Sequence, residues 1–250
     1  MNPALHIEIQ KWNGFAENRA LPNIQSGTVR VWHWPLGVST LEVADLRKVL
    51  SPDELERAER YRFDQHRNEF ILTRAVLRIV LASCTGQSPE RLSFHYSAQG
   101  KPALKNGPGD LRFNVSHTEG LAVLALVRDQ EIGVDAERIR PQPDAQKLAK
   151  RFFSVREQRF LEKLSGDELQ RAFFRCWTRK EAYIKAKGEG LSIPLNAFDV
   201  SLEEDQPAAL VGARPDPTEA GRWALHDLSV GQGYAAALAV ANAPTKQTPA

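Results

Sequence analysis

The feature that most constrains the fold is a weak internal repeat between two distant segments. Residues 73–94 read TRAVLRIVLASCTGQSPERLSF, and residues 179–200 read RKEAYIKAKGEGLSIPLNAFDV. Each segment passes from helical periodicity through Gly to Ser and Pro, and then to a strand that contains Phe. The repeat predicts an α/β (α+β) fold of two similar subdomains, related by a pseudo-twofold axis, with a cleft between them. Coincidence is the alternative, because helix-turn-strand units share turn residues.

The chain divides into two predicted halves, residues 1–130 and residues 131–250. Its 250 residues suffice for one large or two small domains, and 42% hydrophobic residues support a sizeable core. The cleft between the halves is the expected ligand site. Residues 1–27 and the last ten residues are polar, so we expect loose or lightly packed ends. Periodicity and turn residues predict strands at 29–36, 92–97, 111–115, 121–127, 131–135, 198–202, 223–230 and 234–240, a helical pair from Ser51 to Gly86, and helices over 144–188 with breaks at Ser154 and Gly166.

Composition restricts the classes of function. The formal net charge is +2, from 33 Lys and Arg against 31 Asp and Glu, which argues against bulk attraction to nucleic acid or membranes. Cys84 and Cys176 lie in apolar stretches without metal-binding spacing, so we expect buried free thiols and a reducing compartment. The first residues lack the pattern of a secretory signal, and there is no apolar run long enough to span a bilayer. These features predict a cytoplasmic protein.

Two pairs of charged residues interrupt apolar patterns. In EIGVDAERIR, Asp135 and Glu137 are two positions apart, so in an extended strand they share one face. In the helix that follows, the apolar stripe continues by fours from Trp177 to Glu181 and Lys185. The simplest interpretation of Glu181 and Lys185 is a surface pair, worth about 0.2–0.5 kcal/mol.

Three carboxylates on two elements nevertheless suggest a metal site. Asp135, Glu137 and Glu181, without thiol or imidazole partners, would form a hard oxygen site suited to Mg²⁺. The alternative is that Asp135 and Glu137 pair with Arg138 and Arg140. On an alternating strand Arg138 faces away from both carboxylates, whereas a metal ion could bind both carboxylates on the face that they share.

Candidate phosphate-binding residues are spread along the N-terminal half. Lys101 lies beside a Gly-Pro turn in GKPAL, and Ser116 and His117 end the apolar strand FNVSH, where a hydroxyl, backbone amides and an imidazole can meet an anion. Arg57 lies near the first helices. Taken singly, each residue is typical of an exposed charge or a strand end. The chain has neither GxxxxGK[ST] nor GxGxxG, so it lacks a P-loop or Rossmann cradle.

Four short motifs in order resemble the motif set of Sfp-type 4′-phosphopantetheinyl transferases. They are GKP (100–102), FNVSH (113–117), IGVDAE (132–137) and WTRKEAYIKAKGEGL (177–191). The likeness extends over roughly residues 29–240. The related trimeric holo-acyl-carrier-protein synthases are shorter, so the resemblance implies the pseudo-dimeric monomer, in agreement with the internal repeat.

The resemblance implies a reaction and roles for particular residues. The family transfers the phosphopantetheine arm of coenzyme A to a serine of an apo acyl or peptidyl carrier protein and releases 3′,5′-ADP. It implies that Asp135, Glu137 and Glu181 hold Mg²⁺ and that Glu181 and Lys185 are catalytic, with Glu181 as a candidate general base. Lys185 and His117 would contact the pyrophosphate, and Lys101, Ser116 and Arg57 the 3′-phosphate end. Some members place lysines where this chain has Glu54 and Arg57.

Two other functions stay open at this point. The chain could be a non-catalytic module that binds coenzyme A or a carrier protein, although it retains all three carboxylates and Lys185. It could also bind RNA through ERAERYRFDQHR (56–67), an arginine-aromatic stretch. Steep salt dependence without a need for Mg²⁺ would favour RNA binding.

Overall fold

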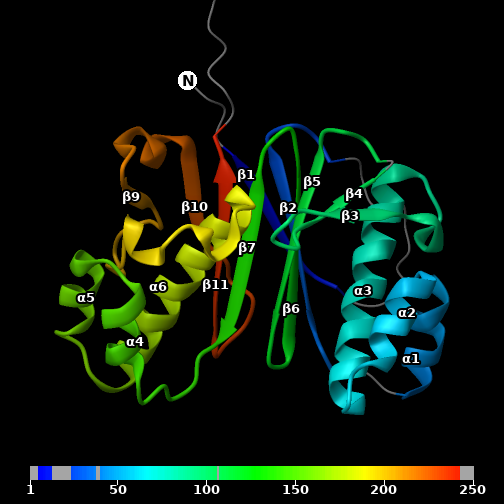
Figure 1. Ribbon diagram of the computed structural model, residues 1–250, viewed down its shortest axis with the longest axis horizontal. Helices are drawn as coiled ribbons and strands as arrows, with labels where there is room; N and C mark the ends of the chain where they lie inside the picture. Colours follow the sequence, from blue (N-terminus) through cyan, green and yellow to red (C-terminus); the bar gives the residue numbers. More distant parts are fainter. Residues whose placement is uncertain (1–4, 13–23, 38–39, 106, 243–250) are drawn as a thin grey trace, which may run out of the picture.

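The computed structural model describes residues 5–12, 24–37, 40–105 and 107–242. Two sheets lie face to face in the middle of the molecule, and helices cover the outer face of each sheet (Figure 1). One apolar cluster fills the space between the sheets and draws on both halves of the chain, with Val31 and Val123 on one side and Val134 and Leu238 on the other. The predicted fold of two facing halves is therefore confirmed.

The N-terminal half builds a four-stranded sheet in the order β1-β2-β6-β5. The helix α3 packs on its outer face, where Ile71, Val76 and Leu77 meet Trp32 and Phe113 in one core. The elements are β1 (His6–Lys11), β2 (Thr28–Pro35), α1 (Thr40–Leu46), α2 (Pro52–Glu59), α3 (Asp64–Thr85), β3 (Phe94–Tyr96), β4 (Pro102–Leu104), β5 (Leu111–Thr118) and β6 (Leu121–Arg128).

The C-terminal half builds a three-stranded sheet in the order β10-β11-β7, covered on its outer face by α6. Its helices follow the predicted breaks, since Ser154 caps α5 and α6 begins at Gly166. The elements are β7 (Ile132–Arg138), α4 (Ala145–Phe152), α5 (Val155–Leu161), α6 (Gly166–Lys187), β8 (Phe198–Val200), β9 (Leu210–Ala213), β10 (Trp223–Asp227) and β11 (Tyr234–Ala241).

The two halves repeat the same order of elements. Apart from β1, which only the N-terminal half has among the described residues, each half has one strand, two short helices, a 22-residue helix, two short strands and two further strands. The sheet order β2-β6-β5 in one half matches β7-β11-β10 in the other. Both long helices end at a glycine with left-handed φ, +70° at Gly86 and +71° at Gly188. The division at residues 130 and 131, between β6 and β7, stays a prediction.

A buried ion pair occupies the same place in each half. Glu54 accepts hydrogen bonds from the backbone N–H of Ser51 and from Arg78, and both Glu54 and Arg78 are buried. Arg78 also donates to the carbonyls of Pro89 and Leu92 in the turn after α3. The guanidinium thus joins three segments of the N-terminal half and is neutralised by the capping glutamate.

In the C-terminal half, Glu157 and Lys180 take these two roles. Glu157 accepts from the backbone N–H of Ser154 at 2.9 Å, and its carboxylate lies 2.8 Å from the ammonium of Lys180. Lys180 also donates to the carbonyls of Leu195 and Phe198, at 2.7 Å each. Since α3 starts at 64 and α6 at 166, Arg78 and Lys180 occupy the same helical position, 102 residues apart. The repeat predicted from the sequence pairs residue 73 with residue 179, a spacing of 106 residues. Within the helix this spacing is four residues too long.

The predicted loose ends are partly wrong. His6–Lys11 forms β1, which pairs in parallel with β2 at the edge of the sheet and is mostly exposed. The polar composition of this segment did not predict a regular strand. The rest of the predicted loose segments lies outside the described residues, except for Leu5, Trp12, 24–27 and 241–242. None of the helices in the described ranges is both long and apolar enough to cross a membrane.

Candidate active site

The site forms where α6 presses directly on β7. A Cβ atom at Gly133 would lie 2.2 Å from the carbonyl oxygen of Ala182 and 2.3 Å from the backbone nitrogen of Ala186. The absence of a side chain therefore lets the backbones of strand and helix touch. Asp135 and Glu137 lie two and four residues beyond Gly133, on the same face of β7 and toward α6. This is the physical reason for glycine in the stretch IGVD.

Asp135 is the centre of the hydrogen bonds at this contact. Its side chain is buried, and its Oδ1 atom accepts hydrogen bonds from Lys185 Nζ at 2.6 Å and from Ser116 Oγ at 2.9 Å. Its Oδ2 atom is buried without a hydrogen-bond partner among the described residues. A buried carboxylate oxygen without a partner is unfavourable, so this atom is available to a cation.

The carboxylates of Glu137 and Glu181 are near enough to Asp135 for its charge to act on both. Burial, followed by the negative charges of Asp135 and Glu137, raises the pKa of Glu181 to about 6 against the opposing effect of Lys185. Burial and Asp135 also raise the pKa of Glu137, while the hydroxyl of Thr118 and the charges of Arg140 and Lys185 lower it. The three carboxylates are therefore electrostatically coupled, and the metal-binding role predicted for them stays a prediction.

Neither Arg138 nor Arg140 forms an ion pair with Asp135 or Glu137 in the described structure. Arg138 lies 3.7 Å from Glu119 and donates to the hydroxyl of Tyr234 at 3.3 Å, away from Asp135 and Glu137. Arg140 contributes only a charge effect on Glu137. The direct ionic partner of Asp135 is Lys185, which comes from the other element of the site.

The donor set matches a hard divalent cation in its chemistry. Within the described ranges, no three His, Cys, Asp or Glu side chains are already arranged as a metal-binding group. Asp135 nevertheless offers an unpaired buried oxygen, and Glu137 and Glu181 are destabilised in their charged forms by burial and by the charge of Asp135. A bound cation would relieve both effects, so the residues present fit Mg²⁺ or a similar ion.

The predicted phosphate-binding residues divide into two groups. Ser116 joins the site through its bonds to Asp135 and Lys185. His117 is exposed at the end of β5, where partial desolvation by the surrounding protein and the charge of Lys185 lower its pKa, so its imidazole is neutral at pH 7. Ser116 therefore lies at the carboxylate site, whereas His117 lies on the opposite face of β5 by strand alternation and is linked to the site by the charge of Lys185.

Lys101 and Arg57 lie elsewhere. The ammonium of Lys101 donates to the carbonyls of Ile132 at 3.1 Å and Ala186 at 3.0 Å, so it fastens the N-terminal half to the start of β7 and the end of α6. It also pairs with Glu131, and burial lowers its pKa. Arg57 is exposed on α2, with its guanidinium 5.2 Å from the centre of the Phe70 ring. The predicted 3′-phosphate contacts of Lys101, Ser116 and Arg57 stay predictions.

Sequence reasoning missed the polar face of β5 that lies beside the site. The side chains of Asn114 and Thr118 flank Ser116 at a spacing of two, so all three point the same way, toward β7. The signal was present, because these polar residues alternate with apolar ones in FNVSHT. The interpretation of FNVSH as an anion-binding strand end does not include this alternating polar face.

The repeat of the fold does not extend to the site. At the spacing of 102 residues that relates the two long helices, Glu181 and Lys185 correspond to Ile79 and Ser83 of α3. The N-terminal half therefore lacks the acidic and basic pair of α6. A chain built from two similar halves thus carries one such group of charges.

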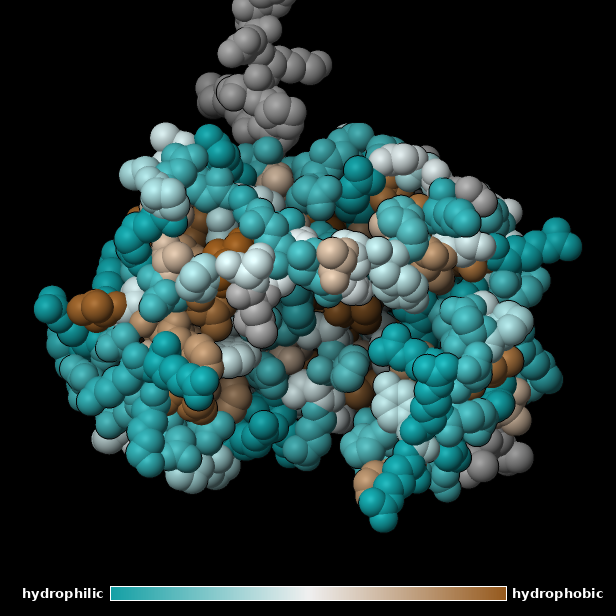
Figure 2. Space-filling model, in the orientation of Figure 1, coloured by the Kyte–Doolittle hydropathy of each residue, from teal (hydrophilic) through white to brown (hydrophobic). Residues whose placement is uncertain are grey.

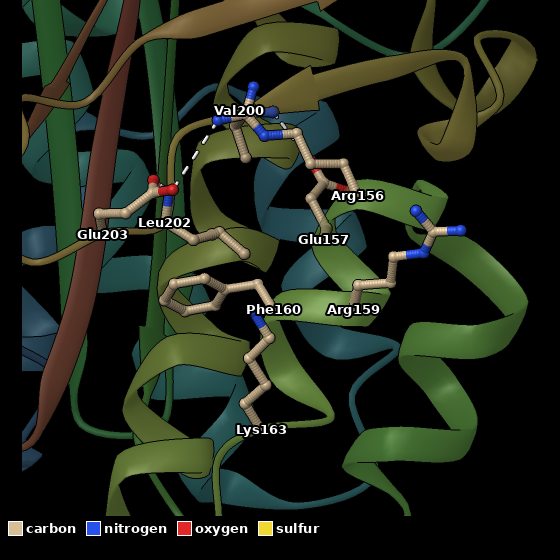
Figure 3. Close-up of a pocket in the computed structure, with 8 residues that line it drawn as sticks. All are labelled: Arg156, Glu157, Arg159, Phe160, Lys163, Val200, Leu202 and Glu203. Carbon is tan, nitrogen blue, oxygen red and sulfur yellow. Dashed lines mark hydrogen bonds and ion pairs between the residues drawn. The ribbon is translucent and has the colours of Figure 1, made fainter.

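Two cavities differ in their relation to the site. A cavity of about 470 Å³ lies between the halves, lined by residues of α3, the β5–β6 turn and Arg138, which follows Glu137. This volume is in the range of small-molecule sites. Another cavity of about 280 Å³ lies between α5 and β8, with Arg156, Phe160 and Leu202 among its lining residues (Figure 3). It contains none of the predicted site residues. In the view of Figure 2, hydrophobic side chains appear in scattered patches between hydrophilic ones.

Comparisons with known proteins agree with these observations. Residues 131–239 match the family model of the 4′-phosphopantetheinyl transferase superfamily, and residues 37–128 match that of the 4′-phosphopantetheinyl transferase N-terminal domain. The 4′-phosphopantetheinyl transferase HetI of Nostoc is 38% identical over 224 residues, which cover 88% of this chain and 91% of HetI. The 4′-phosphopantetheinyl transferase Sfp of Bacillus subtilis is 33% identical over 156 residues, 62% of this chain and 68% of Sfp.

Solved structures include a holo-(acyl-carrier-protein) synthase from Bacillus anthracis in complex with coenzyme A. It is 21% identical, with a TM-score of 0.37, and the match covers 46% of this chain and 96% of that one. The family assignment depends on the two family models and on the long match to HetI. The chain belongs to the Sfp-type 4′-phosphopantetheinyl transferases.

Proposed function

We propose that this chain transfers the 4′-phosphopantetheine group of coenzyme A to a serine hydroxyl of an apo acyl or peptidyl carrier protein, with Mg²⁺, and releases 3′,5′-ADP. The observation that carries the proposal is the group formed by Asp135, Glu181 and Lys185 at the contact of β7 and α6, in a chain of this family. The group combines a proton acceptor, a cation and an unpaired carboxylate oxygen. Phosphoryl transfer needs these components more than it needs a covalent catalyst.

Glu181 is the residue suited to accept the proton of the attacking serine. With a pKa of about 6, its carboxylate is ionised at neutral pH and still basic enough to take a proton. The serine oxygen forms a bond to the phosphorus that carries the pantetheine. The bond from that phosphorus to the bridging oxygen breaks, and the electron pair leaves with 3′,5′-ADP.

Lys185 is suited to stabilise the negative charge of the leaving phosphate. Its side chain is about one-third exposed, and its ammonium is held by Asp135 and Ser116, which leaves one hydrogen for a substrate oxygen. Asp135, Glu137 and Glu181 would hold the Mg²⁺ ion, which supplies charge neutralisation at the pyrophosphate when bound. His117, neutral and close to Lys185, would donate a hydrogen bond to the same phosphates.

The chain is proposed to work as a monomer in the cytoplasm. The two halves already form the contact between the sheets, and the carboxylate site is built from β5, β7 and α6 of one chain. Cys84 and Cys176 are free thiols, consistent with a reducing compartment. Coenzyme A and an apo carrier protein are the proposed partners, without nucleic acid.

The test is the intact mass of an apo carrier protein incubated with this protein, coenzyme A and Mg²⁺. The proposal expects a gain of one phosphopantetheine group with the wild type and its loss with Glu181→Gln and with Lys185→Met. Glu168→Gln is the matched control, because Glu168 is an exposed carboxylate on the first turn of the same helix. Binding of coenzyme A without any mass gain on acyl or peptidyl carrier proteins would favour the non-catalytic module.

A further inference from the structure

The edges of the two sheets are joined by side chains rather than by a backbone ladder. β5 is the edge of the first sheet and β7 the edge of the second. Three alternate side chains of β5 each accept a hydrogen bond from a backbone N–H of β7. The pairs are Asn114 Oδ1 with Val134 N at 2.9 Å, Ser116 Oγ with Ala136 N at 3.4 Å, and Thr118 Oγ1 with Arg138 N at 3.2 Å.

The hydroxyls of this ladder also reach the carboxylates of the site. Ser116 donates to Asp135 Oδ1 at 2.9 Å, and Thr118 donates to Glu137 Oε2 at 3.2 Å. A hydroxyl has one hydrogen, so a Thr118 that accepts from the backbone of β7 directs that hydrogen toward Glu137. Asn114 makes the same kind of contact with the backbone of β7 and donates to no carboxylate of the site in the described structure.

We propose that Thr118 is a positioning residue that orients the Glu137 carboxylate for a divalent cation. Thr118 holds Glu137 through a hydroxyl that is itself fixed by the backbone N–H of the next residue, Arg138. Partners of this kind determine how well a carboxylate ligand is placed.

The inference rests on the proposed role of Asp135, Glu137 and Glu181 as metal ligands, and its test measures metal binding directly. The probe is Mn²⁺ titrated into the full chain with coenzyme A present, with the free ion followed by its paramagnetic resonance signal. Thr118→Val keeps the shape of the side chain and removes the hydroxyl. We expect its dissociation constant for Mn²⁺ to rise by about tenfold or more. Thr118→Ser restores the hydroxyl and should bind Mn²⁺ close to the wild-type value.

Asn114→Val is the matched control. It removes one bond of the ladder, as Thr118→Val does, but its side chain touches no proposed ligand. We therefore expect a similar loss of melting temperature in both variants and a loss of Mn²⁺ affinity in Thr118→Val alone. If Asn114→Val does not fold, Asn114→Ser replaces it, because the shorter side chain draws the acceptor back from β7.

Each other result contradicts the proposal. Wild-type affinity in Thr118→Val would show that the hydroxyl does not position Glu137. Equal weakening in Thr118→Val and Asn114→Val would show that the ladder acts only by joining the halves. A wild-type chain that binds no Mn²⁺ would refute the metal assignment together with this inference, whereas the mass assay tests the transfer reaction separately.

Discussion

Replacing Gly133 by Ala should separate β7 from α6 and with it the parts of the active site. The added Cβ atom would lie 2.2 Å from a backbone oxygen and 2.3 Å from a backbone nitrogen of α6. Ordinary contact distances are about 3.5 Å, so strand and helix must move apart by roughly 1 Å. Backbone atoms of a packed helix cannot rotate away as a flexible side chain does. We expect a cost near the upper end of the usual range for overpacking, about 3 kcal/mol.

Stability and activity should both respond to this change. A loss of about 3 kcal/mol corresponds to a fall in melting temperature of roughly 6–12 °C for a chain of this size. A displacement of about 1 Å between Asp135 on β7 and Lys185 on α6 can reduce the rate by about 100-fold. Thermal melts and the carrier-protein mass assay measure the two effects. Both should be made on Gly133→Ala and on a matched control.

Gly109→Ala provides that control. A Cβ atom at Gly109 would have no neighbour within 4 Å, and Gly109 is not among the residues with left-handed φ. Its replacement should therefore leave melting and transfer unchanged. Gly133→Ala could instead have the same melting temperature and transfer rate as Gly109→Ala. In that case the backbone contact of β7 and α6 at Gly133 does not determine the positions of the site residues.

Three further changes have expected outcomes. Lys180→Met should lower the free energy of unfolding by about 3–5 kcal/mol in a urea titration, because it leaves the carboxylate of Glu157 buried without its partner; a change below about 1 kcal/mol would contradict this. Burial opposes ionisation of Glu219, but hydrogen bonds from Lys187, Trp223 and Tyr183 outweigh it and lower the pKa of Glu219 to about 2. Because the folded pKa lies below the unfolded one, the stabilisation is complete above about pH 4.5 and is lost as pH falls toward 2. Glu219→Gln should reduce the acid dependence of the melting temperature in that window, and an unchanged dependence would refute the assignment. Lys101→Ala should raise KM for coenzyme A with kcat nearly unchanged if Lys101 holds the 3′-phosphate. If the substitution raises KM for dephospho-coenzyme A as much as it raises KM for coenzyme A, Lys101 does not hold the 3′-phosphate and only joins the backbones of Ile132 and Ala186.

Much of the candidate site follows from local periodicity. The spacing of two in β7 predicts that Asp135 and Glu137 share a face, and the spacing of four in α6 places Glu181 and Lys185 one turn apart. These expectations hold because the geometry of a strand or a helix fixes the direction of each side chain. The boundaries of the helices after residue 144 likewise follow from Ser154 and Gly166.

Partners in space were harder to predict. The sequence offered Arg138 and Arg140 as neighbours of Asp135, but its ionic partner is Lys185, which is 50 residues away in the chain. Similarly, the sequence predicts a phosphate contact for Lys101, whereas in this structure its ammonium joins the two halves through the carbonyls of Ile132 and Ala186. A charged side chain takes the partner that packing brings within reach, and sequence distance does not measure that.

The sequence by itself determined the family, the two halves and the residues of the carboxylate site, because these depend on motifs and on the fixed periodicity of strands and helices. Tertiary structure alone decided which face of β5 meets β7, so that Asn114, Ser116 and Thr118 became a ladder to the backbone of the other sheet. It also decided that β1 pairs with β2 and that the repeat shifts by four residues in α6. Contacts between distant segments depend on how whole sheets and helices pack, and a local sequence pattern does not specify which distant segment its surface will contact.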